Sequence, residues 1–169
     1  MLNSALETIE ETLLGDFDGN GVTDVFVSRD GAWWFYAGGV GDAILLNSST
    51  HTAAELALGD FDGDGVSDVF LADGVEWKWS RGGTEQWATL KMSTIVLPDL
   101  LLADLNGDGR SDVISSWSSG GARGGQWMVS RSGSSPWSRL QYSGTPLSDV
   151  GVGDFDGDGV ADIFASGCL

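Results

Sequence analysis

Four acidic loops of nine residues recur along this chain of 169 residues with nearly constant spacing. They begin at Asp16, Asp60, Asp104 and Asp154, so successive starts are 44, 44 and 50 residues apart. Each loop has Asp or Asn at positions 1, 3 and 5, glycine at positions 4 and 6, and Asp at position 9. So regular a repeat restricts the chain to architectures that are built from similar units packed side by side.

The loops predict binding sites for a hard cation. Ca²⁺ prefers six to eight oxygen ligands at about 2.3–2.6 Å, which short Asp and Asn side chains supply. Glycine permits the sharp turns because it tolerates positive φ. No loop contains His or Cys, which argues against zinc and copper. A metal-free Asp-Gly turn is the alternative for one loop, but four copies in register favour Ca²⁺, about four ions per chain.

The expected ligands are the side chains at positions 1, 3, 5 and 9 and the backbone carbonyl at position 7. These residues are Asp16, Asp18, Asn20, Val22, Asp24, Asp60, Asp62, Asp64, Val66, Asp68, Asp104, Asn106, Asp108, Arg110, Asp112, Asp154, Asp156, Asp158, Val160 and Asp162.

The segments around the loops predict strands and exclude an EF-hand. An EF-hand loop needs Glu at position 12 and a helix on each side. Position 12 is here Val27, Leu71, Ser115 or Ala165. Each loop follows a short apolar run and precedes a β-branched or aromatic stretch, which is typical of strands. Each loop therefore connects two strands as a hairpin.

Two further positions repeat outside the loops. The first is occupied by Trp33, Trp77 and Trp127, and the second, ten residues later, by Ala43, Trp87 and Trp137. Glycine-containing turns at 37–41, 80–84 and 130–134 separate them. An insertion within 118–125 explains the longer third spacing. Each unit then has four short strands, and periods of 40 to 50 residues with four strands indicate propeller blades.

We therefore predict an all-β chain that forms one partial β-propeller over residues 1–169, with about three and a half blades of four-stranded antiparallel sheet. The repeats cover roughly 12–50, 56–94, 100–146 and, as a half-repeat, 150–166. Residues 2–4 match 46–48 and are expected to end a preceding blade.

The motif Asp-x-Asp-Gly-Asp-Gly-x-x-Asp between two strands resembles the FG-GAP/VCBS repeat of integrin α-subunit propellers and of many secreted bacterial and fungal proteins. The segments 77–87 and 127–137 resemble the seven-bladed propeller lectins of the Psathyrella velutina type, although Ala37 and Ala43 depart from that pattern in the first repeat. The resemblance implies a calcium-stabilised module that binds carbohydrate. The alternatives are an integrin-like protein-interaction or adhesion domain, or a cut fragment of a larger secreted propeller.

The candidate ligand-binding residues are Trp87, Trp137, Arg81 and Arg131. Indole rings offer flat apolar faces to sugar C–H groups, and neighbouring polar groups orient a bound ligand. The first tryptophan of each repeat is expected to pack in the core between blades. For Trp87 and Trp137, packing in the core is the alternative to ligand binding.

The charge balance narrows the expected partners. The net charge is −17, but 14 of the 25 acidic residues lie in the four loops, and four Ca²⁺ would bring the charge to about −9. Only 8 scattered Lys and Arg residues are present, which argues against nucleic acid as a partner. No apolar stretch is long enough to insert into a membrane. A glycan or a protein is the expected ligand.

Catalysis is not expected. The only histidine is His51, and no catalytic constellation can be built around it. Four acidic residues outside the loops are candidate catalytic groups, but no motif supports them: Glu55, Glu76, Glu85 and Asp99.

Three arrangements would protect the open ends of the repeat: a cut from a longer propeller, a four-bladed closure, or a ring of two chains. We favour the homodimer, since twice three and a half blades is seven and pairing would hide the sheet edges. Calcium loops suit an extracellular, secreted protein, although the N-terminus does not resemble a signal peptide. Cys168 has no internal partner for a disulfide.

Overall fold

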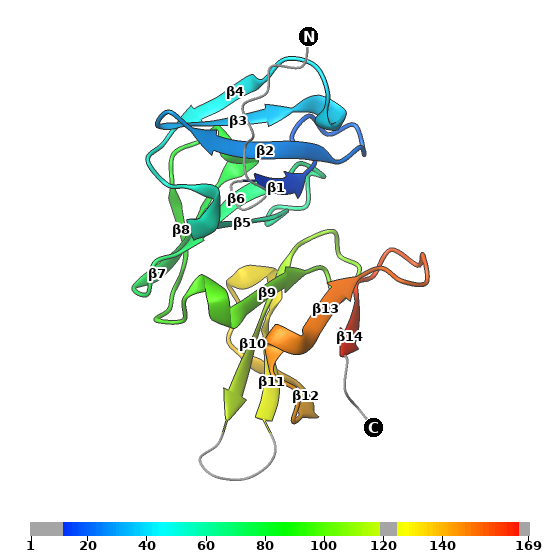
Figure 1. The fold of residues 1–169 in the computed structure, drawn as a ribbon. Coiled ribbons are helices and arrows are strands. Elements are labelled where there is room, and N and C mark those ends of the chain that lie inside the picture. The colour runs from blue at the N-terminus through cyan, green and yellow to red at the C-terminus, as the bar shows by residue number, and fades with distance from the viewer. Residues whose placement is uncertain (1–11, 119–124, 166–169) are drawn as a thin grey trace.

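The computed structural model describes residues 12–118 and 125–165, and these residues form four antiparallel sheets (Figure 1). Three sheets have four strands and the last has two, and within each sheet every strand pairs with the next one along the chain. The all-β prediction of about three and a half blades is confirmed. The expectations about residues 2–4, about Cys168 and about most of the insertion within 118–125 concern residues outside the described ranges.

The strands repeat in the same order in every sheet. The first sheet contains β1 (Thr12–Gly15), β2 (Asp24–Arg29), β3 (Ala32–Tyr36) and β4 (Ile44–Ser48). The second contains β5 (Leu56–Gly59), β6 (Asp68–Ala72), β7 (Glu76–Ser80) and β8 (Ala88–Met92). The third contains β9 (Leu100–Ala103), β10 (Asp112–Ser118), β11 (Gly125–Ser130) and β12 (Ser138–Ser143), and the last contains β13 (Val150–Gly153) and β14 (Asp162–Ala165).

Short 3₁₀ turns stand at two places in the repeat. Between the third and fourth strands lie η2 (Ala37–Gly39), η4 (Arg81–Gly83) and η6 (Arg131–Gly133). Between successive sheets lie η3 (Ala53–Glu55), η5 (Leu97–Asp99) and η7 (Leu147–Asp149). In the described residues, no helix is long and apolar enough to cross a membrane.

The sheets pack face to face as blades. β1 contacts β5, β5 contacts β9, and β9 contacts β13, so the first strands of successive sheets are neighbours. All five residues of β6 are buried, because the second sheet has a neighbour on each face. β14 is followed by no further sheet among the described residues, and in this strand buried positions are absent and exposed and half-buried residues alternate.

The first tryptophan of each repeat fills the core of its blade. Trp33, Trp77 and Trp127 are all buried. Their indole N–H groups donate to the carbonyls of His51, Ile95 and Thr145 at 2.8, 2.9 and 3.0 Å, in each case 18 residues further on. Each tryptophan therefore anchors the segment that leads to the next blade, as a buried indole needs a hydrogen-bond acceptor. The predicted core role of these three residues is confirmed.

Candidate metal loops and inter-blade pockets

The four acidic loops are hairpin connections that are wound around their first aspartate. In the first loop, Asp16 accepts backbone N–H bonds from Gly19 and Gly21 at 2.8 and 2.7 Å. The same two glycine bonds are made to Asp60, Asp104 and Asp154. The glycines have positive φ in all four loops, which explains why the sequence requires them.

These backbone donors favour the ionised carboxylate at position 1. In the fourth loop, the N–H groups of Gly159 and Gly157 hold the pKa of Asp154 below its usual value. In the first loop, desolvation opposes ionisation of Asp16, but the backbone hydrogen bonds together outweigh it and lower its pKa. The loop backbone therefore prepares a negative charge at the position from which a cation would be held.

The last aspartate of a loop joins the loop to the rest of its blade. Asp24, Asp68 and Asp112 are fully buried. Asp68 accepts N–H bonds from Phe61 in its own loop and from Gly82 in η4, both at 2.8 Å. Desolvation by burial raises the pKa of Asp68 to about 6.

Three of the four loops bring carboxylates close enough to share one ion. In each of these loops, carboxylate oxygens from positions 1, 3 and 9 lie within 4.8 Å of one another. The three groups are Asp16, Asp18 and Asp24; Asp60, Asp62 and Asp68; and Asp154, Asp156 and Asp162. The third loop has Asn106 at position 3, so it offers an amide oxygen there. An all-oxygen donor set of this kind fits a hard cation such as Ca²⁺.

Positions 5 and 7 contact each other within every loop. The position-7 N–H group donates to the position-5 side chain, and the pairs are Val22 to Asn20, Val66 to Asp64, Arg110 to Asp108 and Val160 to Asp158. This bond closes the second half of the loop.

The two arginines that the sequence placed at a ligand site lie at the acidic loops instead. Arg81 pairs with Asp62 at 2.5 Å and with Asp64 at 2.9 Å. Arg131 pairs with the buried Asp112. Neither arginine is among the residues that line the pockets beside Trp87 and Trp137. Both are instead held by carboxylates of the loops.

Trp87 lies at the junction of the first two blades. Its ring meets that of Trp33 edge-on, with 5.4 Å between centroids, and that of His51 at 5.9 Å. It borders an open pocket of about 430 Å³, whose other lining residues are Gly31, Ser48, Ser49, Thr50 and His51. The first blade thus supplies a polar wall, and the second supplies an aromatic side chain.

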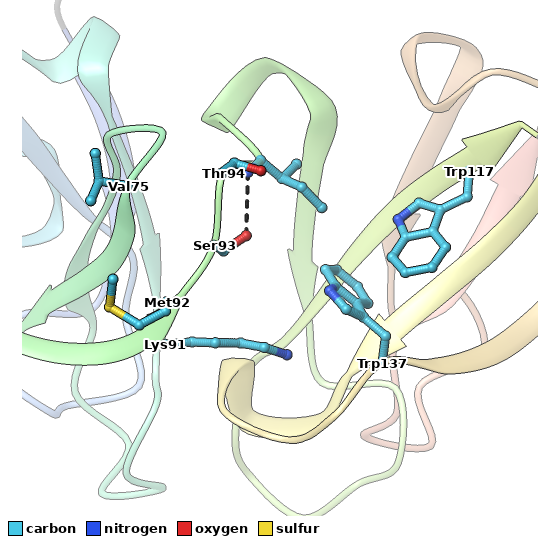
Figure 2. Close-up of a pocket in the computed structure, with 8 residues that line it drawn as sticks. Val75, Lys91, Met92, Ser93, Thr94, Trp117 and Trp137 are labelled. Carbon is cyan, nitrogen blue, oxygen red and sulfur yellow. Dashed lines mark hydrogen bonds between the residues drawn. The ribbon is translucent and has the colours of Figure 1, made fainter.

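An equivalent pocket lies between the second and third blades (Figure 2). Its volume is about 690 Å³, and it is lined by Val75, Lys91, Met92, Ser93, Thr94, Ile95, Trp117 and Trp137. Trp137 meets Trp77 and Trp117 edge-on at 5.6 and 5.8 Å. The alignment of the repeats places Val75, Met92, Ser93, Thr94 and Ile95 at the positions of Gly31, Ser48, Ser49, Thr50 and His51.

Lys91 is a pocket residue that the sequence reasoning missed. Its ammonium group lies 4.9 Å from the ring centroid of Trp137 and 5.6 Å from that of Trp77. It donates to the hydroxyl of Ser130 at 2.9 Å and to the carbonyl of Ser135. Desolvation lowers the pKa of Lys91. The sequence feature that could have identified Lys91 is its alignment with Asn47, because each residue directly precedes the segment that lines its pocket.

Glu55 and Glu76, two of the acidic residues outside the loops, make local structural contacts. Glu55 accepts the N–H of Thr52 at 2.8 Å in a capping box at η3. Glu76 accepts from the hydroxyl of Thr89 at 2.7 Å and pairs with Lys78 at 3.1 Å. These contacts explain both side chains as parts of the blade framework.

Repeated four-stranded sheets, stacked blade on blade and joined through acidic hairpins, define a propeller-type repeat protein. The FG-GAP-like repeat family matches residues 16–71, 60–115 and 104–165. The chain therefore belongs to the FG-GAP-like repeat family. Repeats of this family bind calcium and are typically non-catalytic interaction modules. A search of curated proteins found no match to this sequence.

Proposed function

We propose that the protein is a calcium-stabilised propeller module that binds carbohydrate in the pockets between neighbouring blades. The observation that carries this proposal is the repetition of one pocket design at two junctions, each with a tryptophan from the later blade opposite hydroxyl groups from the earlier blade. Sugars present C–H faces and hydroxyl edges. A half-buried indole next to serine and threonine side chains is complementary to both.

Saccharide binding is tested by comparing two pocket variants with a control. Trp87→Ala and Trp137→Ala each remove the aromatic wall of one pocket, whereas Trp34→Ala removes an indole that lines neither pocket. With a saccharide identified on a glycan array, we expect calorimetry to show an affinity at least about tenfold weaker at the altered pocket of each pocket variant, and unchanged affinity at both pockets of Trp34→Ala. Equal affinity for all four proteins would contradict the proposal.

An integrin-like protein-binding role is the second candidate, and the exposed apolar side chains favour it. Val75 and Met92 at the rim of the larger pocket are 63% and 69% exposed, which suits a protein surface better than a sugar. A protein captured from a pull-down, with binding lost in Met92→Asp and no saccharide bound on the array, would favour this role over the lectin role.

Calcium removal tests the proposed role of the loops. An ion that binds only the folded state at one hundred times its Kd adds about 2.7 kcal/mol to the free energy of unfolding for each site. We expect excess chelator to lower the melting temperature by ten degrees or more, and added Ca²⁺ to restore it. Mg²⁺ is the control, because it prefers a tighter octahedral site. A melting temperature that chelator leaves unchanged would refute calcium stabilisation.

A second copy of the chain is the proposed partner of the last sheet. Phe155 and Phe164 are 66% and 62% exposed, whereas the equivalent Phe61 and Phe70 are buried against the third blade. The first blade of a second copy offers a matching face, since Leu14 is 68% exposed while its equivalent Leu58 packs in a core cluster. Light scattering with Ca²⁺ present should give the mass of a dimer for the wild type and of a monomer for Phe155→Asp. A wild-type monomer would contradict this assignment.

We also propose that the module works outside the cell. Oxygen-ligand loops of moderate affinity fill at the millimolar Ca²⁺ of extracellular fluid. The expected Kd for Ca²⁺ is therefore between about 10⁻⁴ and 10⁻³ M. A submicromolar Kd for all four loops, measured by calorimetry, would favour an intracellular setting instead.

A further inference from the structure

The oxygen atoms of the second loop are divided between backbone donors and one arginine. Both oxygens of Asp60 accept glycine N–H groups, at 2.6 and 2.8 Å. At positions 3 and 5, Oδ1 of Asp62 and Oδ1 of Asp64 accept backbone N–H groups at 3.2 and 2.9 Å. The remaining Oδ2 atoms of Asp62 and Asp64 both pair with the guanidinium of Arg81.

The arginine thus binds the two carboxylate oxygens that the loop backbone leaves free. Those oxygens belong to two of the residues that would hold Ca²⁺. Arg81 comes from η4, the turn after the third strand of the same blade, and η4 lies at the same end of the sheet as the loop, because Val69 at the start of β6 pairs with Ser80 at the end of β7. A guanidinium remains charged at all accessible pH values, and its planar fork suits two carboxylate oxygens at once.

The other loops differ in this feature. The first blade has Ala37 where the second has Arg81, so its turn brings no cation to Asp18. The third blade has Arg131, which pairs with Asp112 at position 9 of its loop. In the residues that the structure describes, no ion pair joins an Arg or Lys to the fourth loop.

We propose that Arg81 and Arg131 are built-in countercations that compete with Ca²⁺ for the second and third loops and so grade the calcium affinities along the chain. This inference rests on the proposed calcium binding. To bind an ion, the second loop must release Arg81 from Asp62 and Asp64, or accept a divalent ion beside a fixed positive charge. Either event weakens binding relative to the same loop without the arginine.

When Ca²⁺ is absent, the same ion pairs stabilise the second and third loops. A loop of four carboxylates repels itself, and a nearby guanidinium offsets part of that repulsion. The second and third loops therefore keep their form at low calcium, whereas the first loop depends on the ion. Chelation should loosen the first blade before the second.

The test measures Ca²⁺ affinity for each loop separately. Gly21, Gly65, Gly109 and Gly159 occupy position 6 of the four loops, and their amide resonances report each loop during an NMR titration with Ca²⁺. Arg81→Ala should raise the affinity of the second loop about tenfold, as expected for removing a unit charge next to a divalent ion. Arg131→Ala should do the same for the third loop.

The reciprocal variant and a control complete the design. Ala37→Arg should lower the affinity of the first loop by a similar factor. Arg139→Ala is the charge-matched control, because Arg139 lies over the ring of Tyr142 and pairs with none of the loops. In chelator, Arg81→Ala should also melt at a lower temperature than Arg139→Ala.

The outcomes separate this inference from the proposed function. Unchanged affinity of the second loop in Arg81→Ala, or a decrease, would overturn the competition and show that the arginine organises the site. If none of the four glycine resonances responds to Ca²⁺, calcium binding itself is refuted. If all four loops bind Ca²⁺ with the same affinity in the wild type and in every variant, calcium binding is supported, but the proposed difference in affinity between the loops is refuted.

Discussion

The second and fourth loops are almost the same peptide in two different environments. They differ at one position of nine, where Ser67 is replaced by Ala161. In the second loop, Phe61 is 4% exposed and Asp68 is fully buried. In the fourth, Phe155 is 66% exposed, and Asp162 is exposed as well.

The difference comes from the neighbouring strands. Phe61 packs with Leu100 and Val113 of the third blade, and Asp68 is covered by the turn η4 of its own blade. The sheet of β13 and β14 has no third strand among the described residues and no following blade. The nine residues therefore determine the shape of the hairpin, whereas the surrounding blades determine how deeply its side chains are buried. Burial in turn determines how much each side chain contributes to the free energy of unfolding.

The largest expected effect compares the two phenylalanines. Phe61→Ala should lower the free energy of unfolding by about 3–5 kcal/mol, because it leaves a cavity between two blades. Phe155→Ala should cost less than about 1 kcal/mol, because the ring is mostly in contact with water. Urea unfolding measures both values, at a protein concentration at which light scattering gives the mass of a monomer. Equal losses would show that the last sheet is covered in solution.

An intermediate effect is expected from pH, with chelator present. The pKa of Asp68 is about 6 in the folded protein and about 3.9 in an unfolded chain, so the folded state binds the extra proton between these values. The free energy of unfolding should therefore rise as the pH falls from 7 to 4, by an amount on the order of 2 kcal/mol from this group.

The Asp68→Asn variant isolates that contribution, since its amide does not titrate. Its stability should rise less steeply over the same pH range than that of the wild type, and Asp162→Asn is the control at the exposed position. Parallel curves for Asp68→Asn and the wild type would show that the buried carboxyl does not carry the pH dependence.

The smallest expected effect concerns the single residue that differs between the loops. The hydroxyls of Ser67 and Ser111 accept the N–H groups of Asp16 and Asp60 at 2.9 and 3.0 Å. Ser67→Ala should cost about 1 kcal/mol, since it removes one such bond between blades. Ala161→Ser should recover a fraction of that amount by adding a hydroxyl opposite Asp104. Thermal melts of both variants provide the check, and a destabilising Ala161→Ser would contradict equivalence of the blade junctions.

The regular parts of this fold could be predicted from the sequence. The spacing of the loops fixed the number of blades, and the repeated Trp33, Trp77 and Trp127 identified the core, because both features are local patterns that recur. Lys91 was missed, since its placement over Trp137 depends on how two blades meet. The ion pairs of Arg81 with Asp62 and Asp64 could not be predicted for a similar reason, since they depend on how η4 meets the loop of its blade. The expected role of Arg81 in ligand binding stays a prediction. Carbohydrate binding stays a prediction.

One series of contacts between the blades has a consequence for how such chains change in length. The N–H groups of Ser67, Ser111 and Ala161 donate to the carbonyls of Asp16, Asp60 and Asp104, at 2.6, 2.5 and 2.7 Å. The donor is always at position 8 of a loop, and the acceptor is always at position 1 of the preceding loop. A repeat unit therefore carries the donor for the hydrogen bond to the preceding blade and the acceptor for the hydrogen bond to the following blade. A gene duplication in frame with the repeat would therefore insert a blade whose joints already fit, and a deletion in the same frame would close without new contacts.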